Sequence, residues 1–253
     1  MQATAEPTLD RSLTNELETK SPWSDNSGLT GREMTDRNRR EWEHLKQKLR
    51  ESWLAFSGCY GESKIDQFVY HGSEADQGNQ RRVVQKLDLL DVTSLVESGT
   101  NILFIGPPGT GKDFMMYVLI RKVWARLDER SNIFHINGCE FRESTMRHRR
   151  DGTEHDRNRI NRMHSKRLLC LSDPSKVGGV ALTDAQADAL YSVLDKRAFH
   201  QLPTWMTINL PTGHDLKAEA ERVFTPPVWD RMKMGAVIAP CNWPSYRKPR
   251  EIV

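Results

Sequence analysis

The residues best suited to chemistry form a glycine-rich run that ends in a lysine. In order, the run is Gly106, Pro107, Pro108, Gly109, Thr110, Gly111 and Lys112. Successive backbone N–H groups of such a loop turn inward onto phosphate oxygens, and the lysine reaches the outer phosphates of a nucleotide. The run therefore predicts a phosphate-binding loop, called the P-loop below, with a nucleotide as its ligand.

The residue that follows the lysine departs from the usual P-loop pattern. That pattern has Ser or Thr there, whose hydroxyl binds Mg²⁺, but this chain has Asp113. A carboxylate at this position is close to the β and γ phosphates, where like charges repel unless a metal ion lies between them. Asp113 therefore indicates an altered metal site.

Short apolar segments of strand length recur along the chain and must position this loop. They span residues 101–105, 133–136, 168–171, 204–209 and 236–239, and amphipathic helical patterns separate them. This alternation predicts an α/β fold, with a five-stranded, mainly parallel sheet flanked by helices and a ligand at the carboxyl ends of the strands. Ser172 and Asp173, which follow the third segment, fall on the same edge as the P-loop.

Composition divides the chain into three regions. Residues 1–35 are polar and predict a disordered tail, and residues 65–253 form the nucleotide-binding core with a small C-terminal segment. Within the core we expect a short strand or loop at 65–71 and one helix over 81–96. Between the two regions, 36–64 is an amphipathic helical region, and we expect its apolar stripe to pack on the protein's own core rather than on a partner. The stripe comprises Trp42, Leu45, Leu49, Trp53 and Phe56.

The overall composition predicts a cytoplasmic protein. The 253 residues carry 37 basic and 34 acidic side chains, a net charge of +3, so affinity for nucleic acid must come from local clustering. The four cysteines show no CxxC spacing, which indicates reduced thiols. We expect no membrane span, because no apolar stretch approaches the length that one requires.

Several weaker motifs follow the P-loop in a recognisable order. They are the polar strand end at 172–173, Leu-Asp-Lys-Arg at 194–197, the strand at 203–210, Trp-Asp-Arg-Met at 229–232 and Ser-Tyr-Arg at 245–247. In this order they resemble the DnaC/IstB-like AAA+ ATPases, which are helicase loaders and transposition helpers. The resemblance covers about 65–247 and implies an ATP-dependent protein that acts on DNA and forms homo-oligomers, with ATP between neighbouring subunits.

The resemblance also implies roles for single residues. Lys112 corresponds to the phosphate-binding lysine, Asn209 to the residue that senses the γ phosphate or polarises water, and Arg231 to an arginine finger that reaches the ATP of the next subunit. A surface ion pair with Asp230 is the alternative for Arg231. Arg247 is a second candidate for sensing the nucleotide, and a contact of the C-terminal tail is the alternative.

Two metal ligands have changed places relative to the family pattern. Family members end the acidic strand with two carboxylates, one on Mg²⁺ and one that orients water, and place a hydroxyl in the P-loop. Here Ser172 stands at the first strand position, Asp173 at the second and Asp113 in the P-loop. Asp113 and Ser172 would preserve the oxygen ligands of Mg²⁺, which is one hypothesis; loss of the metal site, or Asp173 itself on the metal, are the others.

Basic residues are concentrated between the second and third predicted strands. Residues 147–167 hold eight Arg and Lys against three Asp and Glu, within a chain whose net charge is only +3. The candidates for DNA binding are Arg147, Arg149, Arg150, Arg157, Arg159 and Arg162. Few aromatic residues lie among them, so we expect sequence-independent contacts to the DNA backbone; a merely solvated helix face is the alternative.

Three functions are compatible with these patterns. The first is an ATP-binding, DNA-binding AAA+ protein that assists a transposase or loads a replicative helicase, with Mg²⁺-dependent hydrolysis through Asp173, Asn209 and Arg231. The second is a non-hydrolysing, ATP-dependent clamp or regulator with a degenerate metal site. The third is a small-molecule P-loop kinase, which a basic helical insert fits poorly.

Overall fold

The computed structural model describes residues 36–124, 132–175, 180–210 and 215–247. The predicted disordered tail, 1–35, lies outside these residues. Five strands form one sheet in the order β2-β3-β4-β1-β5, and every neighbouring pair is parallel. The strands are β1 (Ile102–Gly106), β2 (Ile133–Asn137), β3 (Leu168–Ser172), β4 (Thr204–Asn209) and β5 (Val237–Pro240). The predicted α/β fold with a parallel sheet flanked by helices is confirmed.

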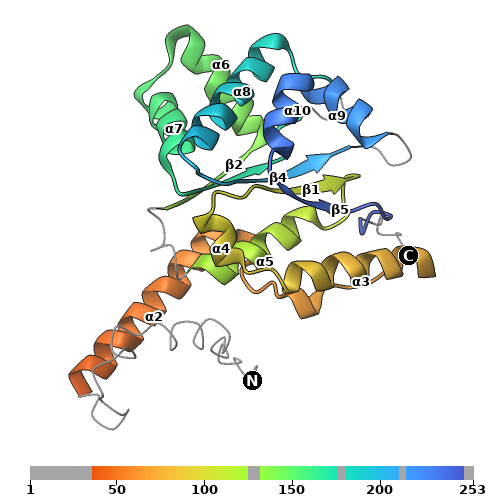
Figure 1. Cartoon of the computed structure of the whole chain (residues 1–253). Helices are drawn as coiled ribbons and strands as arrows, with labels where there is room; N and C mark the ends of the chain where they lie inside the picture. The colour runs from red at the N-terminus through yellow and green to blue at the C-terminus, as the bar shows by residue number, and fades with distance from the viewer. Residues whose placement is uncertain (1–35, 125–131, 176–179, 211–214, 248–253) are drawn as a thin grey trace, which may run out of the picture.

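Helices cover both faces of the sheet, as Figure 1 shows. One face carries α2 (Asp36–Ser57), α3 (Glu74–Asp88), α4 (Val92–Glu97) and α5 (Lys112–Trp124). The other carries α6 (Gly138–Asp151), α7 (Glu154–Ser165), α8 (Asp184–Phe199), α9 (Leu216–Phe224) and α10 (Pro226–Lys233). No helix in the described part of the chain is long and apolar enough to cross a membrane.

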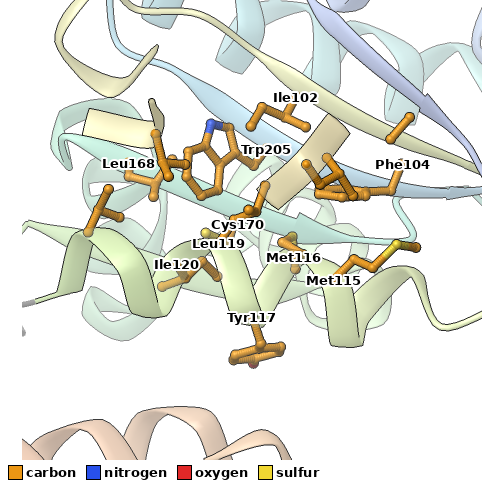
Figure 2. Close-up of a cluster of buried hydrophobic side chains, with 14 of the residues drawn as sticks. Ile102, Phe104, Met115, Met116, Tyr117, Leu119, Ile120, Leu168, Cys170 and Trp205 are labelled. Carbon is orange, nitrogen blue, oxygen red and sulfur yellow. The ribbon is translucent and has the colours of Figure 1, made fainter. Parts of the chain in front are cut away.

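The strands are apolar on both faces because each face has its own core. On the α5 face, Ile102, Cys170 and Trp205 pack against Met116 and Leu119 of the helix, and Figure 2 shows these side chains meeting between helix and sheet. Residues of opposite parity, such as Leu103 and Met206, join the core under α8 and α10. This alternation decides which polar side chains at the strand ends face α5.

Helix α2 packs on α5 through aromatic side chains. Trp53 is 1% exposed, and its ring centroid lies 5.2 Å from that of Trp124, while Phe56 lies 4.6 Å from Trp124. Tyr117 points away from the sheet towards α2 (Figure 2). Such ring pairs add about 0.5–1.5 kcal/mol each beyond their buried area. The expectation that the apolar stripe packs on the protein's own core is confirmed for Leu49, Trp53 and Phe56; the side chains of Trp42 and Leu45 lie outside the described residues.

Two expected elements differ from the structure. Of the short strand or loop expected at 65–71, the loop is found, but a 3₁₀ helix, Ile65–Gln67, precedes it. The single helix expected over 81–96 is two helices, α3 and α4. Asp91 caps the second of them, because its carboxylate accepts a hydrogen bond from Ser94 N at 3.2 Å. An N-cap residue starts a new helix, and here it outweighs the continuous apolar pattern.

Candidate nucleotide-binding site

The P-loop joins the end of β1 to the start of α5. Gly109 and Gly111 have φ angles of 81° and 83°, a left-handed conformation that residues with a Cβ rarely adopt. At Gly109 there is also no room, because a Cβ would lie 2.0 Å from Ser245 Oγ. The glycine spacing read from the sequence therefore reflects both backbone conformation and close packing.

The side chain of Lys112 lies inside the loop. It is 5% exposed, and its Nζ donates to Gly106 O at 2.9 Å and to Pro107 O at 2.5 Å. Burial lowers the pKa of Lys112, and the nearby Cys241 and Asp113 oppose that shift. The ammonium is thus held by carbonyl groups at the mouth of the loop, where phosphate oxygens would be stronger acceptors.

The backbone of the loop offers hydrogen-bond donors. Among the described residues, no acceptor within the protein receives the N–H groups of Gly109, Thr110 or Gly111. Lys112 and Asp113 begin α5, where the first N–H groups have no partner within the helix. These amides and the positive end of the helix form a site for phosphate.

Asp113 faces two hydroxyl groups at the strand ends. Its Oδ1 accepts hydrogen bonds from Ser172 Oγ and from Thr207 Oγ1, both at 2.9 Å. Ser172 and Thr207 are register partners on β3 and β4, so their side chains point to the same face, the one that α5 covers. The sequence predicted that Asp113 and Ser172 share a site, and the structure brings them together. The sequence analysis did not identify Thr207 as part of this site.

The oxygen atoms around Asp113 fit Mg²⁺. One carboxylate and two hydroxyl groups are hard ligands of the kind that Mg²⁺ takes together with water and phosphate oxygens. Within the described ranges, no cluster of three or more His, Cys, Asp or Glu side chains provides an alternative metal site. Asp113 and Ser172 would hold the ion in this arrangement, with Thr207 supporting the carboxylate.

Asp173 takes part in a different set of hydrogen bonds. Its Oδ2 accepts from Asn209 Nδ2 at 2.5 Å, and its Oδ1 accepts from Ser175 Oγ at 2.6 Å. Its φ angle is 51°, and its backbone N–H donates to Thr207 O at 2.8 Å. The chain turns sharply here, which directs Asp173 towards Asn209 rather than towards Asp113. The two candidate catalytic residues are therefore in direct contact.

His135 was not among the candidate residues, yet it reaches the same cluster. It lies on β2, and its Nε2 is 3.0 Å from Ser172 Oγ. Burial lowers the pKa of His135, while the charges of Asp113 and Glu140 act in the opposite direction. Its place in an apolar strand gave no signal in the sequence, because contact with Ser172 depends on how β2 pairs with β3.

A cavity of about 380 Å³ opens beside the P-loop. Its polar lining residues include Lys112, Asp113, Asp173, Thr207 and Asn209, and its aromatic ones are Tyr60, Phe68, Phe114 and Tyr246. A volume within the usual range for small-molecule sites, with both polar and aromatic lining, suits a nucleotide whose phosphates bind the loop. Arg247 also lines the cavity.

The segment 244–247 closes one side of this cavity. Tyr246 N donates to Gly109 O at 2.9 Å, and Tyr246 Oη donates to Val69 O at 2.5 Å. The ring of His71 lies over the Tyr246 ring, with 3.7 Å between centroids. Residues from both ends of the core therefore build the aromatic wall, which the sequence did not reveal because its parts are so far apart along the chain.

Arg231 is absent from the lining of this cavity. It lies on α10, and its Nη2 is 2.8 Å from Asp195 Oδ1 on α8, on the opposite face of the sheet from α5. The alternative partner named from the sequence, Asp230, is wrong: Asp230 pairs with Lys233 at 3.4 Å. Adjacent residues on a helix point in different directions, whereas Asp195 faces Arg231 across the packed helices.

The predicted basic region forms the helices α6 and α7. Arg147 lies 3.4 Å from Glu143, Arg159 lies 3.5 Å from Glu140, and the guanidinium of Arg162 lies 4.2 Å from the centroid of the Phe134 ring. Arg157 is exposed. The side chains of Arg149 and Arg150 are outside the described residues. Acidic neighbours on α6 therefore partly neutralise two of these arginines.

Comparison with known proteins identifies the family. Among solved structures, the chain is similar to the DnaC helicase loader, with a TM-score of 0.54 and 15% identity over 72% of this chain and 98% of that one. It is also similar to domain III of the Thermotoga maritima replication initiation protein DnaA, with a TM-score of 0.50 and 12% identity over 72% and 67% of the two chains. Identities this low support the fold alone. No curated protein matches the sequence. The family model described as IstB-like ATP binding protein matches residues 13–252, and the chain therefore belongs to this family of ATP-binding proteins with the AAA+ fold.

Proposed function

We propose that the protein binds ATP with Mg²⁺, hydrolyses it and assembles on DNA as a homo-oligomer, where it assists a transposase or loads a replicative helicase. The family supports ATP binding, and the names of the similar structures concern helicase loading and replication initiation. The metal-dependent part rests on one observation, the 2.9 Å hydrogen bond from Ser172 Oγ to Asp113 Oδ1.

This hydrogen bond supports the exchange of ligands over the loss of the metal site. A P-loop hydroxyl and a strand carboxylate are the usual pair, and here a P-loop carboxylate meets a strand hydroxyl at hydrogen-bonding distance. Mg²⁺ requires oxygen ligands but does not require that a particular element supply them. If the metal site had been lost, metal binding would not require contact between Asp113 and Ser172.

The reaction follows from what each residue holds. Lys112 and the free P-loop amides bind the β and γ phosphates, and Asn209 holds the carboxylate of Asp173 in place. Asp173 then orients a water molecule for in-line attack on the γ phosphate and accepts its proton. Bound Mg²⁺ would supply positive charge against the charge that spreads over the phosphate oxygens.

A non-hydrolysing clamp is the second candidate, and a specific observation favours it. Both carboxylate oxygens of Asp173 already accept hydrogen bonds, at 2.5 and 2.6 Å, from Asn209 and Ser175. Each of these hydrogen bonds occupies a lone pair that would otherwise be available to a water molecule. Turnover would then require Ser175 to release Asp173.

Three variants test the exchanged site: Asp113→Thr, Ser172→Asp and the double variant, which restores the usual arrangement. We expect each single change to lower Mg²⁺-ATP turnover by at least about tenfold, since a single disturbed metal ligand costs that much or more. The double variant is expected to recover most of the loss. A double variant no more active than the poorer single variant would contradict the exchange, while ATP binding measured by calorimetry would report separately on nucleotide binding.

The role of Arg231 in a neighbouring subunit has its own test. Lys112→Ala removes phosphate binding, and Arg231→Ala removes the proposed finger, so each variant is expected to be inactive alone. Mixed assemblies contain interfaces with an intact P-loop on one side and an intact arginine on the other. Mixing is therefore expected to restore part of the DNA-dependent turnover, and a mixture as inactive as its components would argue that Arg231 only pairs with Asp195.

A further inference from the structure

His135 contacts Ser172, one of the two proposed metal ligands. It stands on β2 with its side chain on the face that α5 covers, 5.4 Å from the Tyr117 ring and 6.3 Å from the Phe56 ring between centroids. Within the described part of the chain, its ring forms one polar contact, between Nε2 and Ser172 Oγ at 3.0 Å. Burying a polar imidazole ring among aromatic side chains costs free energy unless the ring has a hydrogen-bond partner, and Ser172 is that partner.

The direction of each hydrogen bond follows from the number of protons. A serine hydroxyl has one proton, and Ser172 donates it to Asp113 Oδ1. Ser172 Oγ is therefore the acceptor towards His135, and Nε2 carries the hydrogen. Because Thr207 donates to the same Oδ1, the chain of donors runs from His135 through Ser172 to Asp113, with Thr207 joining from the side.

This chain determines which electron pairs remain for a ligand. Ser172 Oγ has two acceptor positions, of which His135 fills one. Among the described residues, neither hydroxyl donates to Asp113 Oδ2. One lone pair on Ser172 Oγ and the Oδ2 atom of Asp113 are thus left for a metal ion.

We propose that His135 is a positioning residue for the metal site, holding the Ser172 hydroxyl so that its proton points to Asp113 and its second lone pair remains available to a metal ion. This inference rests on the proposed Mg²⁺-dependent function. Without the N–H donor, the hydroxyl can rotate among its staggered positions, and only one of them keeps both the bond to Asp113 and the free lone pair. Partners of metal ligands commonly change metal affinity or activity by about 10- to 100-fold when they are removed.

The test compares two substitutions at one position. His135→Gln keeps a side-chain N–H donor near the place of Nε2, whereas His135→Leu removes it but leaves an apolar side chain that suits the contacts with Phe56 and Tyr117. Binding of a non-hydrolysable ATP analogue is measured by calorimetry in EDTA and in Mg²⁺, and Mn²⁺ binding to the analogue complex is followed by electron paramagnetic resonance.

We expect all three proteins to bind the analogue equally in EDTA. His135→Leu is expected to lose about tenfold of the Mg²⁺-dependent gain in affinity and to bind Mn²⁺ more weakly, while His135→Gln stays within about threefold of the wild type. Full metal dependence in His135→Leu would overturn the inference. If the wild type bound the analogue but gained nothing from metal, the proposed metal site itself would fail instead.

A double-mutant cycle with Ser172→Ala separates positioning from general damage. If His135 acts through Ser172, adding His135→Leu to Ser172→Ala is expected to change metal dependence by less than about twofold. Additive losses would overturn the inference, because they would show that His135 acts by another route. Should His135→Leu fold poorly, His135→Met, an unbranched apolar variant, replaces it in the same cycle.

Discussion

Asn209 Nδ2 lies 2.5 Å from Asp173 Oδ2, and the two residues come from the ends of neighbouring strands 36 positions apart. This contact joins a candidate general base to the residue that would sense the γ phosphate. We expect Asn209→Ala and Asp173→Asn each to lower turnover by about 100-fold, since donors and bases at such positions contribute about that much.

Nucleotide affinity distinguishes this effect from a loss of binding. The dissociation constant for Mg²⁺-ATP is expected to change by less than about fivefold in both variants, because neither side chain belongs to the phosphate-binding loop. Single-turnover hydrolysis and calorimetry measure the two quantities. If both variants turned over ATP at the wild-type rate, neither residue would take part in the catalytic step.

Asp113 should make ATP binding unusually dependent on metal. Two unit charges about 4 Å apart repel by about 4 kcal/mol at an effective dielectric constant near 20, so the carboxylate opposes metal-free ATP. Asp113→Asn removes this charge, and we expect it to bind ATP at least about tenfold more tightly than the wild type in EDTA. In Mg²⁺ it is expected to bind less tightly than the wild type.

A matched control is Asp184→Asn, which removes an exposed carboxylate from the first turn of α8. It is expected to leave both affinities unchanged. Calorimetric titration with ATP, with and without Mg²⁺, checks all three proteins. Equal metal dependence in Asp113→Asn and the wild type would show that the carboxylate does not face the phosphates.

Arg157 is an exposed arginine of the basic cluster on α7, and it tests the DNA-binding proposal. Arg157→Ala is expected to weaken binding of duplex DNA irrespective of its sequence and to reduce the slope of log affinity against log salt by about 0.9. Fluorescence anisotropy at several salt concentrations measures the slope. Arg222→Ala on α9, where the arginine pairs with Glu219, is the control and is expected to keep the wild-type slope.

The environment of His164 is expected to make the folded protein less stable in mild acid. Burial and the charges of Lys196 and Arg197 lower its pKa from 6.5 to about 4, and its Nε2 is buried with no partner among the described residues. Below pH 6.5 the unfolded chain binds a proton here that the folded protein does not, so the free energy of unfolding falls as the pH drops from 6.5 towards 4. Above pH 6.5 both states are neutral and the effect disappears.

Urea denaturation at pH 7 and pH 5 measures this dependence. His164→Leu is expected to lose less stability than the wild type between the two values, whereas His155→Gln, at an exposed position on the same helix, is expected to behave like the wild type. The same decrease in all three proteins would assign the acid sensitivity to other groups.

Arg197 is expected to be structural. It is fully buried and donates to Met163 O and Lys166 O at 2.8 Å and to Pro203 O at 2.6 Å. Arg197→Met removes the guanidinium donor from Met163 O and Lys166 O, while Pro203 O keeps the hydrogen bond from Leu169 N at 3.3 Å. Each carbonyl left without a donor where water cannot reach costs about 1–3 kcal/mol, so the free energy of unfolding should fall by at least about 2 kcal/mol. Urea denaturation checks the loss, and the folded fraction is expected to bind ATP normally.

The sequence predicted the parts of the site that are local along the chain. The P-loop, the strand ends and the proximity of Asp113 and Ser172 depend on short spacings and on the rule that parallel strands present their carboxyl ends at one edge. Thr207, Ser175 and His135 were missed because their contacts arise from sheet register and from a left-handed turn at Asp173. The split of 81–96 into two helices was missed because Asp91 lies between apolar residues that suit either outcome.

The hydrogen bond from Tyr246 to Val69 joins residues 177 positions apart at the rim of the cavity, and His71 meets Pro244 in the same place at 2.8 Å. All five strands of the sheet lie between these two points of the chain. A molecule bound in the cavity would contact both segments, Val69 from one and Tyr246 from the other, and would hold them together. The midpoint of thermal unfolding is therefore expected to rise when nucleotide is bound.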